Sequence, residues 1–295
     1  MSQLSLYPEL QKADDHVVNV ASVRQYSPFR YPGGKTWLVP QVLKWIRKRH
    51  HGECPLFVEP FAGGGIVTLT IAATKLAKRC LMIERDDEIA AVWKTLIYGD
   101  AKWLAQRILE FDLTHETANE IIESTPKTTE EKAFRTILKN RTYHGGILAP
   151  GSGLLKNGEN GKGIHSRWYP QTLANRILNI LHFKDRIDFI EGDAFETIDH
   201  YKDDESTTFF IDPPYTASKK KAGSRLYRFH SVDHEHIFKS MHDTAAAFML
   251  TYDDANEIRD LCAKYNLPFV RVPMKGTHHI KYHELLICDN IEWSQ

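Results

Sequence analysis

The stretch that most constrains the fold of this chain is Phe209–Tyr215, which reads Phe-Phe-Ile-Asp-Pro-Pro-Tyr. The β-branched and aromatic residues of 207–211 are typical of a buried strand. Pro213 and Pro214 end that strand, because proline lacks the backbone N–H that a sheet or a helix requires. We therefore expect Asp212 at the carboxyl end of a strand, where open α/β sheets bind their ligands. Taken alone, the same residues would also fit an ordinary strand-ending turn.

The composition is that of a globular protein without a membrane-spanning segment. Of the 295 residues, 42% are hydrophobic and 26% are charged, which are ordinary values. The length fits one large α/β domain or a domain with an insertion. No run approaches the roughly 20 apolar residues of a membrane-spanning helix, and residues 1–16 lack the apolar core of a signal peptide. We therefore expect a cytoplasmic location. The four cysteines form no C-x-x-C pair, which predicts reduced thiols and no zinc site: Cys54, Cys80, Cys262 and Cys288.

The charge is balanced over the whole chain but not along it, since 38 basic residues face 38 acidic ones. Residues 127–176 hold nine Lys and Arg against three Glu, a local charge of 9 − 3 = +6. Residues 213–228 hold five basic residues and no acid. A positive face on a neutral protein is compatible with phosphate binding, although a solvated mixed surface would give the same counts.

The order of apolar patterns predicts strands and helices that alternate, interrupted by a helical insertion. We expect an arm at 1–24, a catalytic domain formed by 25–100 and 173–295, and an insert at 101–172. Residues 144–167 hold seven of the 17 glycines, which predicts a substrate-binding segment with a hairpin-like tip. Strands are expected at 56–59, 80–83, 187–190, 207–211, 247–251, 268–274 and 284–288. Helices are expected at 36–49, 66–78, 86–98, 170–182, 233–244 and 254–265, with two or three more within 101–142.

Two glycine-rich turns precede expected helices. Gly33-Gly34-Lys35-Thr36 does not fit a nucleotide-phosphate loop, because Phe29 stands where that motif needs glycine and no strand precedes it. Gly63–Gly65 follow a strand, so a ligand can approach their backbone, although Thr68 takes the place of the third glycine of a dinucleotide fingerprint. Glu84 follows about 20 residues later, where nucleoside sites place a carboxylate on ribose hydroxyls; a surface glutamate is the alternative. The histidine-rich residues 278–283 fit a polar hairpin loop better than a metal site.

Three motifs in this order resemble the Dam-type, N6-adenine-specific DNA methyltransferases of the alpha group. They are Arg-Tyr-Pro-Gly-Gly-Lys at 30–35, Phe-Val-Glu-Pro-Phe-Ala-Gly-Gly-Gly at 57–65, and Asp-Pro-Pro-Tyr at 212–215. The resemblance covers about residues 27–290. Weaker similarities lie at 83–85, 140–142, 167–170, 191–193 and 284–287.

The resemblance implies a Rossmann-like sheet with an inserted, mainly helical target-recognition domain, S-adenosylmethionine as methyl donor, and no metal. The implied cofactor residues are Tyr31, Gly34, Lys35, Glu59, Pro60, Phe61, Ala62, Gly63, Gly64, Glu84, Asp193, Ala194 and Asp212. Among them, Tyr31 and Lys35 would line the methionine end, Glu84 would hold the ribose, and Asp193 the adenine amine. Packing alone would also account for Tyr31, and Glu59 would also serve as a cap of the following helix.

The implied catalytic residues are Asp212, Pro213, Pro214 and Tyr215. The exocyclic amine of adenine is a poor nucleophile, because its lone pair is delocalised into the ring. Acceptors at the Asp212 carboxylate and the Pro213 carbonyl would draw the nitrogen toward tetrahedral geometry and stabilise its developing positive charge. Tyr215 would stack on the base, which must first be flipped out of the duplex.

Double-stranded DNA is the implied partner of a protein that we expect to be a monomer, with a dimer also compatible, from a prokaryote or a phage. Base methylation of this kind also belongs to restriction-modification systems. The basic segments supply the candidate DNA-binding residues: Lys139, Asn140, Arg141, Lys156, His165, Arg167, Lys219, Lys220, Lys221 and Arg225. The same corner could serve RNA adenine or cytosine N4, and a non-catalytic nucleic-acid-binding relative is a further alternative. Asp212 favours adenine.

Overall fold

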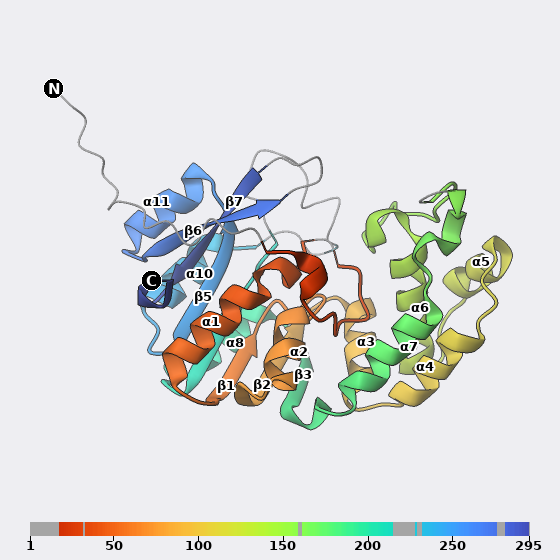
Figure 1. Ribbon diagram of the computed structural model, residues 1–295, viewed down its shortest axis with the longest axis horizontal. Helices are drawn as coiled ribbons and strands as arrows, with labels where there is room; N and C mark the ends of the chain where they lie inside the picture. The colour runs from red at the N-terminus through yellow and green to blue at the C-terminus, as the bar shows by residue number, and fades with distance from the viewer. Residues whose placement is uncertain are drawn as a thin grey trace.

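The computed structural model describes residues 18–31, 33–158, 161–214, 228, 232–275 and 281–294. They form a twisted sheet covered by helices on both faces, with a helical lobe at one side (Figure 1). The predicted arm at 1–24 lies largely outside the described residues, apart from a short 3-10 helix at Val20–Ser22. Searched over the described residues, the protein has no helix that is both long and apolar enough to cross a membrane.

The sheet of the described residues has the order β3-β2-β1-β4-β5-β7-β6. The first five strands of that order are parallel, while β7 runs antiparallel to both β5 and β6. The order reverses between β1 and β4, and ligands of doubly wound sheets bind at such a switch point. This topology confirms the predicted Rossmann-like methyltransferase sheet. The strands are β1 Cys54–Glu59, β2 Ala77–Glu84, β3 Ile187–Glu191, β4 Thr207–Ile211, β5 Ala247–Asp253, β6 Phe269–Lys275 and β7 Lys281–Cys288.

Alternate residues of the strands feed two apolar cores, one on each face of the sheet. On β4, for example, Phe210 packs into one core, and Phe209 and Ile211 pack into the other. The first face is covered by α1 Val39–His50, α2 Ile66–Ala73 and α3 Asp87–Ile97. The second face is covered by α8 Ala194–Tyr201, α10 His234–His242 and α11 Asn256–Lys264. Because both faces are buried, the central strands read as continuous apolar runs.

The helical lobe consists of α4 Ala101–Glu110, α5 His115–Glu123, α6 Thr129–Thr142 and α7 Pro170–Ile180 (Figure 1). Side-chain oxygens of Asp100, Thr114 and Thr128 accept backbone N–H bonds and cap the first three helices. The apolar core of the lobe is continuous with that of the α1–α3 face. Helix α6 packs on α3, and α7 packs on α4, so α7 lies with the lobe although it starts near the predicted boundary at 172.

Short 3-10 helices complete the described chain: η2 Lys35–Leu38, η3 His144–Gly146, η5 Gly163–Arg167, η6 Lys184–Arg186 and η7 Glu292–Ser294. Tyr143 and Leu154 form an antiparallel bridge, which fits the hairpin-like segment predicted there. The loop predicted at 278–283 lies partly outside the described residues, and β7 already begins at Lys281.

One predicted helix was wrong in its length, and one helix was missed. The helix predicted at 66–78 ends at Ala73, because Lys75 turns the chain with a φ of 57° and β2 starts at Ala77. Helix α8, which follows β3, was not predicted. It has 8 residues, starts with the side-chain cap of Asp193, and buries only Ala194, Thr197 and Ile198, so its apolar pattern is too short to stand out.

Candidate active site

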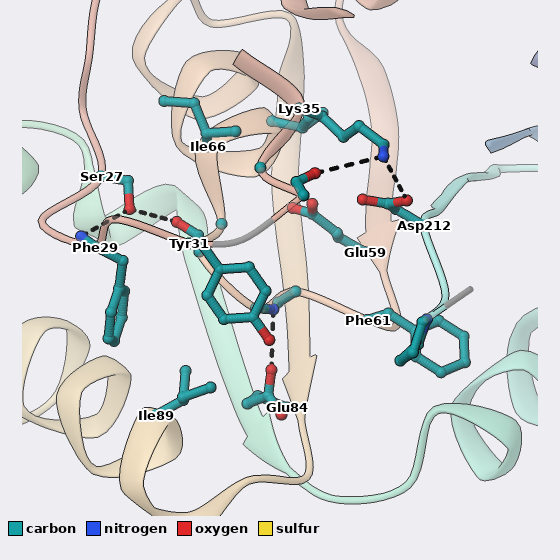
Figure 2. Close-up of a pocket in the computed structure, with 18 of the residues that line it drawn as sticks. Ser27, Phe29, Tyr31, Lys35, Glu59, Phe61, Ile66, Glu84, Ile89 and Asp212 are labelled. Carbon is teal, nitrogen blue, oxygen red and sulfur yellow. Dashed lines mark hydrogen bonds and ion pairs between the residues drawn. The ribbon is translucent and has the colours of Figure 1, made fainter. Parts of the chain in front are cut away.

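One cavity of about 810 Å³ opens along the carboxyl ends of β1, β2, β4 and β5. It is lined by every residue that the resemblance assigned to the cofactor, and by Pro213 and Pro214 of the expected catalytic set. Tyr215, the fourth catalytic residue of that prediction, lies outside the described residues. Figure 2 shows Tyr31 and Glu84 in the middle of this cavity, with Lys35 and Asp212 toward one side. The volume is within the range of small-molecule sites.

The glycine turn after β1 is shaped by a tyrosine ring. A Cβ atom on Gly63 would lie 2.6 Å from Cε1 of Tyr31, and one on Gly64 would lie 2.8 Å from Cβ of Tyr31. Gly63 also has a φ of 46°, a conformation that favours glycine. The glycines therefore let Tyr31 approach the turn. The indole N–H of Trp93, on α3, donates to the Gly63 carbonyl at 3.0 Å and fixes the turn.

Glu84 ends β2 and faces the same turn. Its two carboxylate oxygens accept the backbone N–H groups of Gly63 at 2.9 Å and of Asp86 at 2.8 Å. Burial raises the pKa of Glu84 to about 7. A carboxylate has about four acceptor positions, so these two bonds leave capacity for ribose hydroxyls.

Asp193 lies at the start of α8, where its carboxylate accepts the Phe195 backbone N–H at 2.8 Å and pairs with Arg85 at 3.3 Å. Phe195 packs edge-on against Phe61, with their ring centroids 6.2 Å apart. Both rings line the cavity. Two aromatic faces beside a carboxylate are suited to a purine that offers an amine.

Glu59, at the end of β1, is bound to the helix that follows. Its Oε2 accepts from the backbone N–H of Thr68 at 3.1 Å and also from the Thr68 hydroxyl. Burial raises the pKa of Glu59 to about 8, and the hydrogen bonds from Thr68 only partly oppose that effect. Glu59 therefore closes the first turn of α2 at the wall of the cavity, which is the capping alternative expected from the sequence.

Asp212 lies just past the end of β4, as the sequence predicted, in a cluster that we call the acidic corner: Lys35, Asp212, Thr251, Asp253 and Glu284. The Lys35 ammonium is 3.2 Å from Oδ1 of Asp212 (Figure 2). Thr251 donates its hydroxyl to the same oxygen at 2.6 Å. The ammonium also lies 3.4 Å from the Glu284 carboxylate. Lys35 was expected at the methionine end of the cofactor, and the structure joins it to the expected catalytic aspartate.

Arg30, Arg141 and Arg176 line another part of the cavity wall, and Arg167 is close enough for its charge to act on Arg141. We call these four residues the arginine cluster. Arg141 is only 7% exposed. Its guanidinium donates to the Pro28 carbonyl, while its Nε has no partner. Burial, together with the charges of Arg176, Arg30 and Arg167, lowers the pKa of Arg141 to about 9. Within the described part of the chain, Arg141 forms no ion pair with a carboxylate, so this positive charge lacks a counter-ion.

The other residues predicted to bind DNA are dispersed. Asn140 is fully buried, and its amide joins Arg30 to Gly146 through their backbone groups. Its side chain thus has a structural role here, and its contact with DNA stays a prediction. Lys139 pairs with Glu88 on α3. Lys156 and His165 are exposed and Arg167 is half-buried, while Lys219, Lys220, Lys221 and Arg225 lie outside the described residues.

Sequence reasoning gave no role to Glu284, Thr251 or Arg30. Glu284 is the one acid among the apolar residues 284–288, a pattern that can indicate a buried functional carboxylate. Asp253 was noted only as a strand-end acid, but β5–β7 pairing places it directly opposite Glu284. Among the described residues, no group of three His, Cys, Asp or Glu side chains is arranged to hold a metal ion.

One family model matches most of the chain. The model of the D12 class N6 adenine-specific DNA methyltransferases matches residues 31–274, so the chain belongs to that family. It is therefore an S-adenosylmethionine-dependent methyltransferase, as the resemblance predicted. No curated protein matches the sequence.

Several solved structures are similar over nearly the whole chain. They include a precorrin 8W decarboxylase of Methanobacterium thermoautotrophicum, with 12% identity, a TM-score of 0.35, and 96% of this chain and 100% of that chain covered. The rRNA methyltransferase aviRa of Streptomyces viridochromogenes has 13% identity and a TM-score of 0.40, with 88% and 86% covered. A precorrin-6y C5,15-methyltransferase of Geobacter metallireducens has 11% identity and a TM-score of 0.35, with 96% and 98% covered. With such scores, these structures give no argument about the substrate.

Proposed function

We propose that the protein methylates the N6 amine of an adenine in duplex DNA. The observation that carries this proposal is the position of Asp212, at the wall of the cavity that the cofactor residues line. Its neighbours in that wall are Pro213 and Pro214, whose rings fix the direction of the adjoining carbonyls. The family of the chain supplies adenine as the base.

The residues present fit S-adenosylmethionine. Glu84 would hold the ribose, and Asp193, Phe61 and Phe195 would hold the adenine, since these side chains line one part of the cavity. Tyr31 and the glycine turn would contact the methionine part. When bound, the cofactor supplies an electrophilic methyl group on a sulfonium sulfur.

The catalytic contribution of the chain lies in how it holds the amine. The Asp212 carboxylate and the Pro213 carbonyl would accept the two amine hydrogens, which leaves the nitrogen lone pair directed away from them. The negative charge of Asp212 would stabilise the positive charge that develops on nitrogen during attack. Lys35 and Thr251 already fix that carboxylate, so little reorganisation is needed. The surplus proton then leaves the nitrogen for a base or water.

The arginine cluster supports a polyanionic substrate. A buried guanidinium without a counter-ion costs free energy, which an incoming phosphate would offset by charge-assisted, bidentate hydrogen bonds. Arg141 joins the cavity to the lobe, because α6 carries it and its guanidinium reaches Pro28. The lobe would thus fix the DNA backbone while the base enters the cavity. Lys156, His165 and the basic residues 219–225 remain predicted contacts.

Transfer of tritium from labelled cofactor to duplex DNA tests this function. We expect label in N6-methyladenine after enzymatic hydrolysis of the DNA, and none with the Asp212→Ala variant. Matched reactions with single-stranded RNA and with adenine-free duplex DNA distinguish the alternative acceptors. Label confined to RNA, or to cytosine N4, would contradict the proposal.

A further inference from the structure

The acidic corner contains a carboxylate that the proposed chemistry has not used. Glu284 projects from β7 and is 4% exposed, as is Lys35 from η2. The Lys35 ammonium lies between two carboxylates, at 3.2 Å from Asp212 and 3.4 Å from Glu284. It also lies 3.4 Å from the Gly33 carbonyl. Lys35 therefore links a strand-end aspartate to an acid on the antiparallel edge of the sheet.

Strands β5 and β7, which carry Thr251 and Glu284, are fixed relative to each other by sheet pairing. Asp253 on β5 is opposite Glu284 on β7, and Thr251 is opposite Leu286. Thr251 donates to Asp212 at 2.6 Å, so β5 and β7 hold Asp212 together, one through a hydroxyl and the other through Lys35. Groups on a rigid sheet are positioned more accurately than groups on loops.

The division of the Lys35 charge has a chemical consequence. If Lys35 paired with Asp212 alone, its ammonium would neutralise most of the negative charge of the Asp212 carboxylate. That charge is the one that would stabilise the substrate amine as it becomes positive. Because Glu284 shares the ammonium, Asp212 retains negative character toward the cavity. Loss of the Glu284 charge would move the ammonium toward Asp212 and weaken its stabilisation of a cationic amine.

We propose that Glu284 is a positioning residue for methyl transfer, which acts through Lys35 on the orientation and charge of Asp212. This inference rests on the proposed role of Asp212 as the acceptor of the amine. It concerns how the corner is held and does not depend on which nucleic acid supplies the base.

The ionisation of Glu284 provides a distinctive readout. Burial raises the pKa of Glu284 to about 7; Lys35 opposes this effect, whereas Asp212 and Asp253 add to it. These three groups, from η2, the residue after β4, and β5, are the charges that face it in the described structure. Below pH 7, Glu284 takes up a proton and loses its hold on Lys35. The rate should therefore fall on the acid side of neutrality and reach its plateau above it.

The test compares Glu284→Gln with the wild-type enzyme in single-turnover methyl transfer at saturating DNA and cofactor, from pH 5.5 to 9. We expect a rate about 10- to 100-fold lower at pH 8, the magnitude typical of a disturbed electrostatic contact, with cofactor binding within a few-fold. The decline in rate near pH 7 should disappear in the variant. Glu284→Asp keeps the charge and should recover both that decline and part of the rate.

A matched control is Glu88→Gln, since Glu88 is also a buried glutamate bound to a lysine, Lys139 on α6, and is not among the residues that line the cavity. It should leave the rate and its pH profile unchanged. The inference fails if Glu284→Gln, folded and able to bind cofactor, keeps the wild-type rate and acid decline. It also fails if Glu284→Asp recovers nothing while its thermal melt is normal. Failure of the proposed function appears separately, as absence of wild-type methylation of DNA adenine, and the comparison can then be made with the acceptor actually used.

Discussion

Two regions of the same cavity treat buried charge in opposite ways. In the acidic corner, the Lys35 ammonium lies within 3.4 Å of two carboxylates, those of Asp212 and Glu284. The Thr251 hydroxyl donates a hydrogen bond to the carboxylate of Asp212. In the arginine cluster, the Arg141 guanidinium donates to a backbone carbonyl and lies near like charges, and no carboxylate of the described residues pairs with it. In the first region the fold pairs Asp212 and Glu284 with an ammonium, while in the second the described residues offer the Arg141 Nε no acceptor.

This difference indicates a division of labour. A compensated, hydrogen-bonded corner is preorganised, which suits the chemical step, since its dipoles need not rearrange during reaction. Arg141, which pairs with no carboxylate of the described residues, would gain free energy when an anion arrives, and this suits binding. Burial of the Arg141 charge would therefore be unfavourable in the free protein, and contact with a phosphate would offset that free energy.

The largest effect on the rate is expected from a substitution in the acidic corner. Asp212→Ala removes the acceptor of the amine, so we expect the single-turnover rate of methyl transfer to fall by at least about 10³-fold. The cofactor dissociation constant should stay within a few-fold, because most of the cofactor residues lie at the end of β1 and in the turn after it, at the end of β2 and at the start of α8. Isothermal titration with cofactor checks binding, and quenched-flow labelling checks the rate. A variant with wild-type rate would remove Asp212 from the mechanism.

A smaller effect is expected from the arginine cluster. Arg141→Met keeps the volume but removes the charge, so we expect about 10-fold weaker DNA binding and a salt slope lower by about 1. The melting temperature of the free protein should rise or stay level, since a buried charge without a counter-ion is lost. Lys102→Met, on the exposed surface of α4, serves as control and should change neither quantity. Unchanged affinity and salt slope for the Arg141 variant would place the cluster outside the DNA interface.

The smallest effect concerns Glu59, beside the corner. Its folded-state pKa of about 8 exceeds the reference value of 4.5, so the folded protein binds more protons than the unfolded chain between these values. Stability should therefore fall as pH rises from about 5 to 8. Glu59→Gln can still accept from Thr68, and we expect it to reduce that fall by roughly 1–3 kcal/mol. Urea unfolding at pH 5 and pH 8.5 measures this, and an identical fall in both proteins would contradict it.

Local patterns in the sequence located the strand ends well. An apolar run that stops at Asp212 before two prolines, or at Glu84, predicts where the strand ends and that a carboxylate follows or ends it. Parallel pairing then brings such strand ends to one edge of the sheet. Every residue expected at the cofactor indeed lines one cavity. Their individual roles remain predictions.

Contacts between distant segments could not be predicted in the same way. Lys35 and Glu284 are 249 residues apart, and their contact depends on the antiparallel return of β7, which no local pattern encodes. Asn140 was expected to touch DNA because it lies in a basic segment. Its burial depends on Arg30, 110 residues earlier in the chain. The hydrogen bonds between the Asn140 side chain and the Arg30 backbone form only when the lobe packs against that distant segment.

The central claim is that one region does the chemistry and the other holds the nucleic acid. The most direct test measures both the DNA dissociation constant and the single-turnover rate at saturating DNA for the wild type, Asp212→Ala and Arg141→Met. We predict that the aspartate variant loses the rate and keeps the affinity, while the arginine variant loses affinity and keeps the rate within a few-fold. Loss of the saturated rate in the arginine variant, or loss of DNA affinity in the aspartate variant, would contradict the account.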